Sequence, residues 1–178
     1  MKDGRNATQA ELNYALRRIV YDTMVAAKAV AAIRAAGRDY SAKEMAKMSA
    51  LIMVRNLDAF LFLDKHDRAD DISVTDFTLS DWEVSSNAAL TSGERRRIHK
   101  IAGHIVASEP RPFKDNDTIW QKILLIIEEA RDFVRNCLAE EKAKYTGKAP
   151  YYVRRLNGLL RQIGLRQLPE PRAANDGT

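Results

Sequence analysis

The chain has 178 residues, of which 46% are hydrophobic and 30% are charged, a balance that suits one domain with its own core. It contains a single cysteine, Cys137, so an intrachain disulfide is excluded and a reducing, cytoplasmic location is expected. The most apolar windows, 26–36 and 123–127, are far shorter than the ~20 residues that a membrane span needs, and no signal peptide is evident. We therefore expect a soluble protein that does not associate with a membrane.

The net charge of +5 is unevenly distributed along the chain. Residues 142–178 hold 8 basic and 2 acidic side chains, whereas residues 1–141 hold 21 and 22. A basic C-terminal region favours an acidic partner such as nucleic acid, although a solvated surface helix would have the same composition.

Four Ser/Thr-x-x-Glu patterns predict helix starts, because the hydroxyl and the carboxylate together satisfy free backbone N–H groups. They are Thr8 with Glu11, Ser41 with Glu44, Ser80 with Glu83, and Thr91 with Glu94. Apolar residues at helical spacing then predict helices, in chain order, at 9–36, 42–65, 81–89, 92–107, 118–145 and 151–163. Between the second and third helices lies an aspartate-rich connection, 66–78, which lacks the spacing and the central glycine of a calcium loop.

Some side chains in these elements carry specific expectations. Trp82 is expected to anchor the short third helix, Gly147 to end the fifth helix, and Arg55 to form a partly buried ion pair with an aspartate. The buried face of the second helix is expected to comprise Met45, Met48, Leu51, Ile52, Ala59 and Phe62.

These elements predict an all-α fold, a bundle of four to five main helices that are mostly antiparallel. Residues 1–147 form the expected bundle domain, 148–168 a basic C-terminal helix and 169–178 a disordered tail. The last helix carries an apolar stripe, flanked by arginines, that could dock on another chain: Leu156, Leu159, Leu160 and Ile163.

The helix that follows Thr91 contains the candidate catalytic residues. Arg97 and His104 are seven positions apart, about two helical turns, so they should lie on one face roughly 10 Å apart. Arginine binds phosphate oxygens as a fork, and histidine exchanges protons near neutral pH. We therefore predict Arg97 and His104 as catalytic residues acting on an RNA phosphodiester. The predicted substrate-binding residues are Arg96, His99, Lys100 and Arg111. No metal site or cofactor is predicted.

An arginine followed, after four to six residues, by a histidine in a helical domain of this size resembles the HEPN superfamily. The sequences 51–61, Asp70-Asp71-Ile72 and Asp76-Phe77 also resemble small bacterial proteins near that superfamily. The resemblance covers about residues 10–140. It departs from the usual pattern at Ile98, because a polar residue ordinarily follows the arginine.

The resemblance implies a metal-independent endoribonuclease. His104 would act as general acid or base on the 2′-hydroxyl or the leaving oxygen, and Arg97 would stabilise charge on the phosphate. It also implies a homodimer with two facing motifs, and an antitoxin partner in a toxin–antitoxin or phage-defence system.

Two other interpretations stay open. The chain is alternatively a non-catalytic helical module that binds protein or nucleic acid through its basic C-terminal helix, or a structural subunit of a larger assembly. In either case His104 would be a histidine at the edge of the core that hydrogen-bonds a neighbouring helix.

Overall fold

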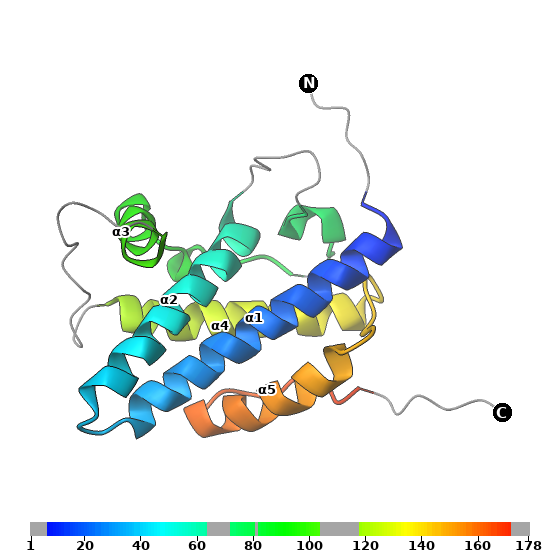
Figure 1. Ribbon diagram of the computed structural model, residues 1–178. Helices are drawn as coiled ribbons and strands as arrows, with labels where there is room; N and C mark the ends of the chain where they lie inside the picture. The colour runs from blue at the N-terminus through cyan, green and yellow to red at the C-terminus, as the bar shows by residue number, and fades with distance from the viewer. Residues whose placement is uncertain (1–6, 64–71, 81, 104–117, 172–178) are drawn as a thin grey trace.

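The computed structural model of the chain describes residues 7–63, 72–80, 82–103 and 118–171. Within these ranges the protein consists of helices and connecting segments, with no strand, as Figure 1 shows. The elements are α1 (Gln9–Ala35), α2 (Tyr40–Phe62), the short 3₁₀ helices η1 (Val74–Phe77) and η2 (Ser86–Ala88), α3 (Ser92–Gly103), α4 (Ile119–Ala139) and α5 (Ala149–Ile163). The predicted all-α fold is confirmed.

The start of α1 follows the prediction, whereas the start of α2 does not. The Thr8 hydroxyl accepts a hydrogen bond from the Glu11 backbone, and the Glu11 carboxylate accepts one from the Thr8 backbone N–H, which is a complete capping box. In α2 the cap is Asp39, whose Oδ1 accepts from the Ala42 N–H at 3.0 Å. Ser41 therefore does not cap α2, because a carboxylate two residues earlier already binds the free backbone group.

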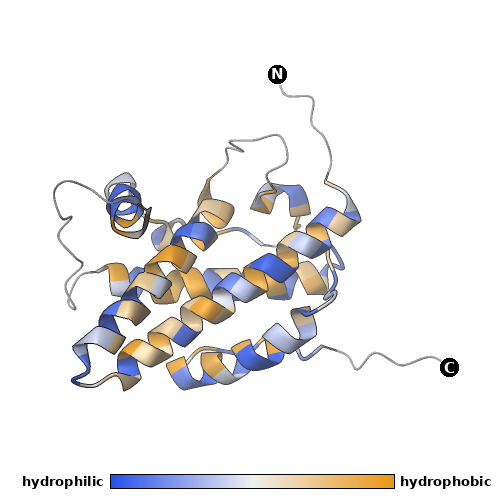
Figure 2. Cartoon of the chain, in the orientation of Figure 1, coloured by the Kyte–Doolittle hydropathy of each residue, from blue (hydrophilic) through white to orange (hydrophobic). Residues whose placement is uncertain are grey.

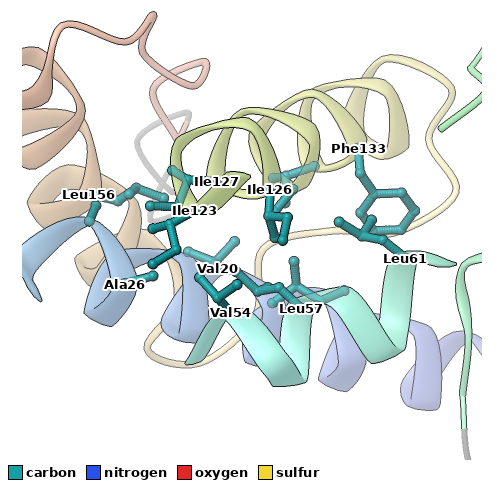
Figure 3. Close-up of a cluster of buried hydrophobic side chains, with 14 of the residues drawn as sticks. Val20, Ala26, Val54, Leu57, Leu61, Ile123, Ile126, Ile127, Phe133 and Leu156 are labelled. Atoms are coloured by element: carbon teal, nitrogen blue, oxygen red, sulfur yellow. The ribbon is translucent and has the colours of Figure 1, made fainter. Parts of the chain in front are cut away.

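The core lies between α1, α2 and α4, with α5 closing it from the side (Figure 1). In Figure 3, Ile123 and Ile126 of α4 point toward Val20 of α1 and Val54 of α2. The buried hydrophobic residues of α1, α2, α4 and α5 form one cluster, and each of these helices carries both hydrophobic and hydrophilic residues along its length (Figure 2). The amphipathic spacing in the sequence therefore produces one continuous core.

The apolar stripe of α5 is part of this core. Leu156 and Leu160 have no exposed surface, and Figure 3 places Leu156 beside Ile127 and Ala26. The Tyr21 and Tyr152 rings meet edge to face with their centres 5.2 Å apart. α1 and α5 pack against each other and run in the same direction (Figure 1). The prediction that this stripe docks on another chain is wrong, because α1 of the same chain already covers it.

The buried face of α2 differs from the predicted one. Met45 is 65% exposed and Ala59 is also exposed. The face that packs against α1 and α4 consists of smaller or branched residues, namely Ala46, Ala50, Leu51, Val54, Leu57 and Leu61. Small side chains let two helices approach closely, so packing against α1 selects the alanines over the larger Met45.

α4 ends eight residues before Gly147, the predicted stop. Glu141 adopts a left-handed conformation with φ of 53°, and the Lys142 N–H donates to the Cys137 carbonyl at 2.9 Å. Helices commonly end at a residue in this left-handed conformation, and that residue is usually glycine. The Lys144 backbone N–H donates a hydrogen bond to Asn13 Oδ1 of α1 at 2.7 Å. This contact holds the segment after α4 in a non-helical conformation, although its composition favours a helix.

The helix predicted at 81–89 is also absent from the described residues, which there contain η2 alone. Ser80, the expected cap, instead donates its backbone N–H to the Glu140 carboxylate at 2.9 Å. Trp82 nevertheless packs against Phe133 with ring centres 5.3 Å apart, so its expected anchoring contact exists without a helix around it. The predicted helix ends at 65 and 107 lie outside the described residues.

Candidate functional site

The position of α3 is fixed by a buried carboxylate on α2. Asp58 is 1% exposed, and its oxygens accept hydrogen bonds from Arg95 Nε at 2.6 Å and Nη2 at 3.2 Å. The Leu90 backbone N–H donates to the same carboxylate at 2.8 Å. A two-pronged contact between arginine and carboxylate sets orientation as well as distance, so Arg95 fixes which side of α3 faces α2.

A second polar contact holds the first turn of α3 against α4. The predicted Thr91–Glu94 pair is confirmed: the Thr91 N–H donates to Glu94 Oε2 at 2.7 Å, and the Glu94 N–H donates to the Thr91 hydroxyl at 3.2 Å. Lys122 of α4 reaches the same Glu94 oxygen at 2.7 Å. Partial burial acts to raise the pKa of Glu94, but the hydrogen bonds from Lys122 and Thr91 outweigh it and lower that pKa below its usual value.

The predicted site residues lie on different sides of α3, and these contacts determine which side faces the core. Ile98 is fully buried, and Arg96 and Lys100, about 160° away around the helix, form the exposed outer face. Arg97 is half-buried on one flank and His99 is exposed on the other, since positions two apart do not share a face. Figure 2 shows the predominantly hydrophilic colouring of α3.

His104 and Arg111 lie outside the described residues. The pairing of Arg97 with His104 therefore stays a prediction. The structure does distinguish Arg97 from Arg95, two positions earlier, because Arg95 forms the ion pair with Asp58.

The expected ion pair exists, but its cation is Arg95 and not Arg55. Arg55 is exposed, whereas Asp58, three positions later, is buried and pairs with Arg95 on another helix. Sequence spacing within α2 could not reveal this contact, because its two members are 37 positions apart.

A second group of candidate functional side chains lies where α1 and α5 meet. α1 carries Tyr14, Arg17, Arg18 and Tyr21, and α5 with its N-cap carries Lys148, Tyr151, Tyr152 and Arg155. Both sets follow the spacing i, i+3, i+4, i+7, which places four residues on one side of a helix. We call these eight residues the tyrosine–arginine surface. The sequence analysis missed it, although this shared spacing of aromatic and basic residues was a usable signal.

The tyrosines and cations of this surface contact one another. The Arg17 guanidinium lies 5.0 Å from the Tyr14 ring centre, and the Arg155 guanidinium lies 5.7 Å from that of Tyr151. Arg155 Nη1 also donates to the Tyr151 hydroxyl at 2.7 Å. Tyr14 is 60% exposed and Tyr151 48% exposed, so ring surface remains open to a ligand.

A hollow of about 520 Å³ lies within this surface, lined by Tyr14, Arg17, Arg18, Tyr21, Gly147, Lys148 and Tyr152. Gly147 has φ of 56°, and a Cβ there would lie 3.0 Å from Arg17 Nη1. The glycine thus allows the turn before α5 and leaves room for the Arg17 guanidinium.

The surface has a positive charge. It contains four cations, and Asp22, which pairs with Arg18 at 3.1 Å, is the one carboxylate recorded in an ion pair with them among the described residues. Burial raises the pKa of Asp22, although the neighbouring Arg18 charge acts in the opposite direction. Arg17, Lys148 and Arg155 therefore give this part of the molecule a net attraction for anions.

Three further observations bear on the chemistry. Cys137 is fully buried, and burial raises the pKa of its thiol, so it is not an activated nucleophile. No group of three His, Cys, Asp or Glu side chains gathers at metal-binding distance in the part of the chain that the structure describes. None of the described helices combines the length and apolarity that crossing a membrane requires.

No family model, no curated protein sequence and no solved structure matches the chain significantly. The fold and these two groups of side chains define an all-α bundle with a carboxylate-anchored basic helix and an aromatic, basic surface.

Proposed function

We propose that the protein binds single-stranded RNA through the tyrosine–arginine surface. The observation that carries the proposal is the hollow of about 520 Å³ in which tyrosine rings and cationic side chains from two parallel helices converge. Proteins that hold single strands combine these two components, because bases stack on aromatic rings and phosphates pair with cations.

The geometry gives each component a role. The exposed rings of Tyr14 and Tyr151 offer stacking surfaces, and Arg17 and Lys148 lie where the adjoining phosphates would pass. Bases in a duplex are already stacked, so a single strand is the form that can use these rings. The hydroxyl of Tyr14 would supply a hydrogen-bond partner for a ribose 2′-hydroxyl, which favours RNA over DNA.

The test measures the affinity for a fluorescently labelled, mixed-sequence RNA of about 12 nucleotides by anisotropy. Tyr14→Ser should weaken binding roughly tenfold, because one stacked base contributes about 1–3 kcal/mol. Tyr40→Ser is the matched control, since Tyr40 is 72% exposed and lies on α2, away from this surface. Equal affinities for the two variants would contradict the proposal.

Charge is tested in the same assay at several salt concentrations. Lys148→Gln should reduce the slope of log affinity against log salt by about 1, because one phosphate contact is lost. Arg38→Gln removes the same charge from the turn between α1 and α2 and should leave the slope unchanged. Single-stranded DNA and duplex RNA of the same sequence should both bind more weakly than single-stranded RNA.

A second candidate function is metal-independent RNA cleavage by Arg97 and His104. The contact that favours it is the Asp58–Arg95 pair, which orients α3: of the two half-buried arginines of this helix, Arg95 is bound to Asp58 and Arg97 lies on a different side. In this proposal His104 transfers the proton and Arg97 stabilises the charged phosphate, with two copies of the pair facing each other in a homodimer. An antitoxin partner belongs to this second candidate alone.

Cleavage is tested by incubating end-labelled RNA with the protein in EDTA. Arg97→Gln and His104→Ala should each reduce the rate by about 10²-fold or more. Arg135→Gln, which changes an arginine with a 50% exposed side chain on α4, should not. Retained RNA binding without any cleavage would overturn the enzyme proposal and leave the binding proposal standing.

A further inference from the structure

A second hollow adjoins the tyrosine–arginine surface and shares two of its residues. It has a volume of about 390 Å³ and lies between α1 and α2, which pack side by side (Figure 1). Tyr14 and Arg18 line both hollows, and Asp22, one further turn along α1, lines only this one. We call it the α1–α2 pocket. A strand held by the tyrosine–arginine surface would therefore lie beside this pocket.

Part of the lining of the α1–α2 pocket is apolar and rigid. Leu57 is almost fully buried, and Phe60 and Ile72 are partly buried residues that pack against the core. The Phe60 ring meets the Phe133 ring edge to face with the ring centres 5.1 Å apart, which holds it in position. The volume falls within the ~300–1,000 Å³ that is usual for small-ligand sites. The apolar lining therefore suits a flat aromatic ligand.

The polar group in this pocket is the Asp22 carboxylate, which is 4% exposed. Arg18 Nε donates to Oδ2 at 3.2 Å and lies 3.1 Å from Oδ1, yet Oδ1 accepts no hydrogen bond within the part of the chain that the structure describes. Burial raises the pKa of Asp22, and Arg18 and the Asn56 side chain act in the opposite direction. Because a buried acceptor without a hydrogen bond is costly, the pocket favours a ligand that offers N–H donors.

Guanine is the RNA base that fits this carboxylate best. Its Watson–Crick edge presents two adjacent donors, N1–H and the 2-amino group. A carboxylate has about four lone-pair sites, so Asp22 can accept both while it keeps Arg18. Adenine and cytosine each place an acceptor nitrogen beside their amino group, and uracil has a carbonyl on both sides of its N3–H. These acceptors would face the carboxylate and be repelled by it.

We infer that the α1–α2 pocket binds a guanine base of the RNA strand, with Asp22 accepting hydrogen bonds from N1–H and the 2-amino group and with the base packed against Phe60. The inference rests on the proposed RNA-binding function and adds sequence specificity to it. Stacking on exposed tyrosines accepts any base, whereas a buried polar group rejects a base that leaves it unpaired.

The first test compares labelled RNA oligomers of about 12 nucleotides by anisotropy with the unchanged protein. An oligouridylate with one central guanine should bind roughly tenfold more tightly than oligouridylate alone, because hydrogen bonds to a charged, buried acceptor are gained. Replacing that guanine with hypoxanthine, which lacks the 2-amino group, should remove most of the gain. This comparison does not depend on the folding of any variant.

The second test identifies the residue that selects the base. Asp22→Asn keeps the shape of the side chain but places an amino group where an acceptor is needed, so the ratio of the two affinities should fall to about 1. Asp39→Asn is the matched control, because Asp39 is an exposed cap of α2 and asparagine caps equally well. The control should keep the preference for guanine, and melting temperatures should show that both variants fold.

The outcomes separate this inference from the function on which it rests. Equal affinities for the guanine, hypoxanthine and all-uridine oligomers, with binding still weakened by Tyr14→Ser, would overturn the inference and leave RNA binding standing. A guanine preference that persists in Asp22→Asn would also overturn it. Failure of every oligomer to bind would contradict the proposed function and this inference together.

Discussion

α3 and α5 are attached to the bundle in different ways. α5 buries Leu156 and Leu160 completely against the core, so water-excluded apolar surface holds it in place. α3 buries Ile98, packs the partly buried Ile101 against the core, and is further held by Asp58–Arg95 and Glu94–Lys122. Apolar contact is non-directional, whereas a forked ion pair fixes an angle, so α3 is the helix whose orientation depends on single side chains. Arg97, one of the two candidate catalytic residues, lies on α3, and half of the tyrosine–arginine surface lies on α5 and its N-cap.

The largest effect should come from breaking the α3 attachment. Asp58→Ala leaves Arg95 and the Leu90 N–H without their buried acceptor, and we expect a loss of about 3–5 kcal/mol in the free energy of unfolding. Chemical denaturation measures this. Asp39→Ala, which removes an exposed helix cap, should cost only about 1 kcal/mol. Similar losses in both variants would mean that the buried pair contributes no more than a cap.

The corresponding change in α5 should be somewhat smaller and act elsewhere. Leu160→Ala removes a fully buried side chain and should cost about 3 kcal/mol. In amide hydrogen exchange, protection in α5 and the facing part of α1 should fall more than protection in α3. A uniform fall across all helices would show that the two attachments are not separable.

A pH titration should distinguish the polar attachment from the apolar one. Because the pKa of Glu94 is lowered in the folded protein, its ionised form adds stability above the unfolded pKa of about 4.3, and this is lost as the pH falls through the folded pKa. Glu94→Gln should therefore cost about 1 kcal/mol at neutral pH and less at pH 3, because the charge is lost as the pH falls through the folded pKa. Leu160→Ala should show the same cost at both pH values. A pH-independent cost of Glu94→Gln would rule out its charge as the cause.

The smallest effect should be a gain in stability confined to α5. Gly158 lies inside α5, and a Cβ added there would meet no atom within 4 Å, so Gly158→Ala should stabilise the protein by about 0.5–1 kcal/mol. Gly147→Ala is the contrasting variant, because the left-handed backbone there and the nearby Arg17 make a Cβ unfavourable. Melting temperatures should move in opposite directions, and a shift in the same direction would contradict this view of the two glycines.

The sequence predicted helices well where local signals agreed with tertiary packing. Thr8 with Glu11 and Thr91 with Glu94 are capping pairs in both the prediction and the structure. It failed where distant contacts decided the outcome. Glu140 binds the Ser80 backbone across the fold, and Asn13 binds the Lys144 backbone, so the segments around them leave their locally favoured helices.

The same distinction applies to the candidate sites. The basic run on α3 is visible in the sequence because its members are adjacent. Its division into an anchored Arg95, an outer Arg96 and a half-buried Arg97 depends on Asp58, which no local pattern connects to them. The tyrosine–arginine surface joins residues from the two ends of the chain, and only the parallel packing of α1 and α5 brings these together.

That parallel packing has a consequence for how the protein is made. The contact between Asn13 and Lys144 spans 131 positions, so α1 emerges from the ribosome long before the helix that covers its side. At a synthesis rate of about 5–20 residues per second, the apolar face of α1 that α5 covers stays exposed for roughly 10 s before α5 is made. We therefore expect chaperones to bind the N-terminal helices during synthesis. A chain truncated before α5 should aggregate or be degraded by proteases, because this apolar face stays exposed.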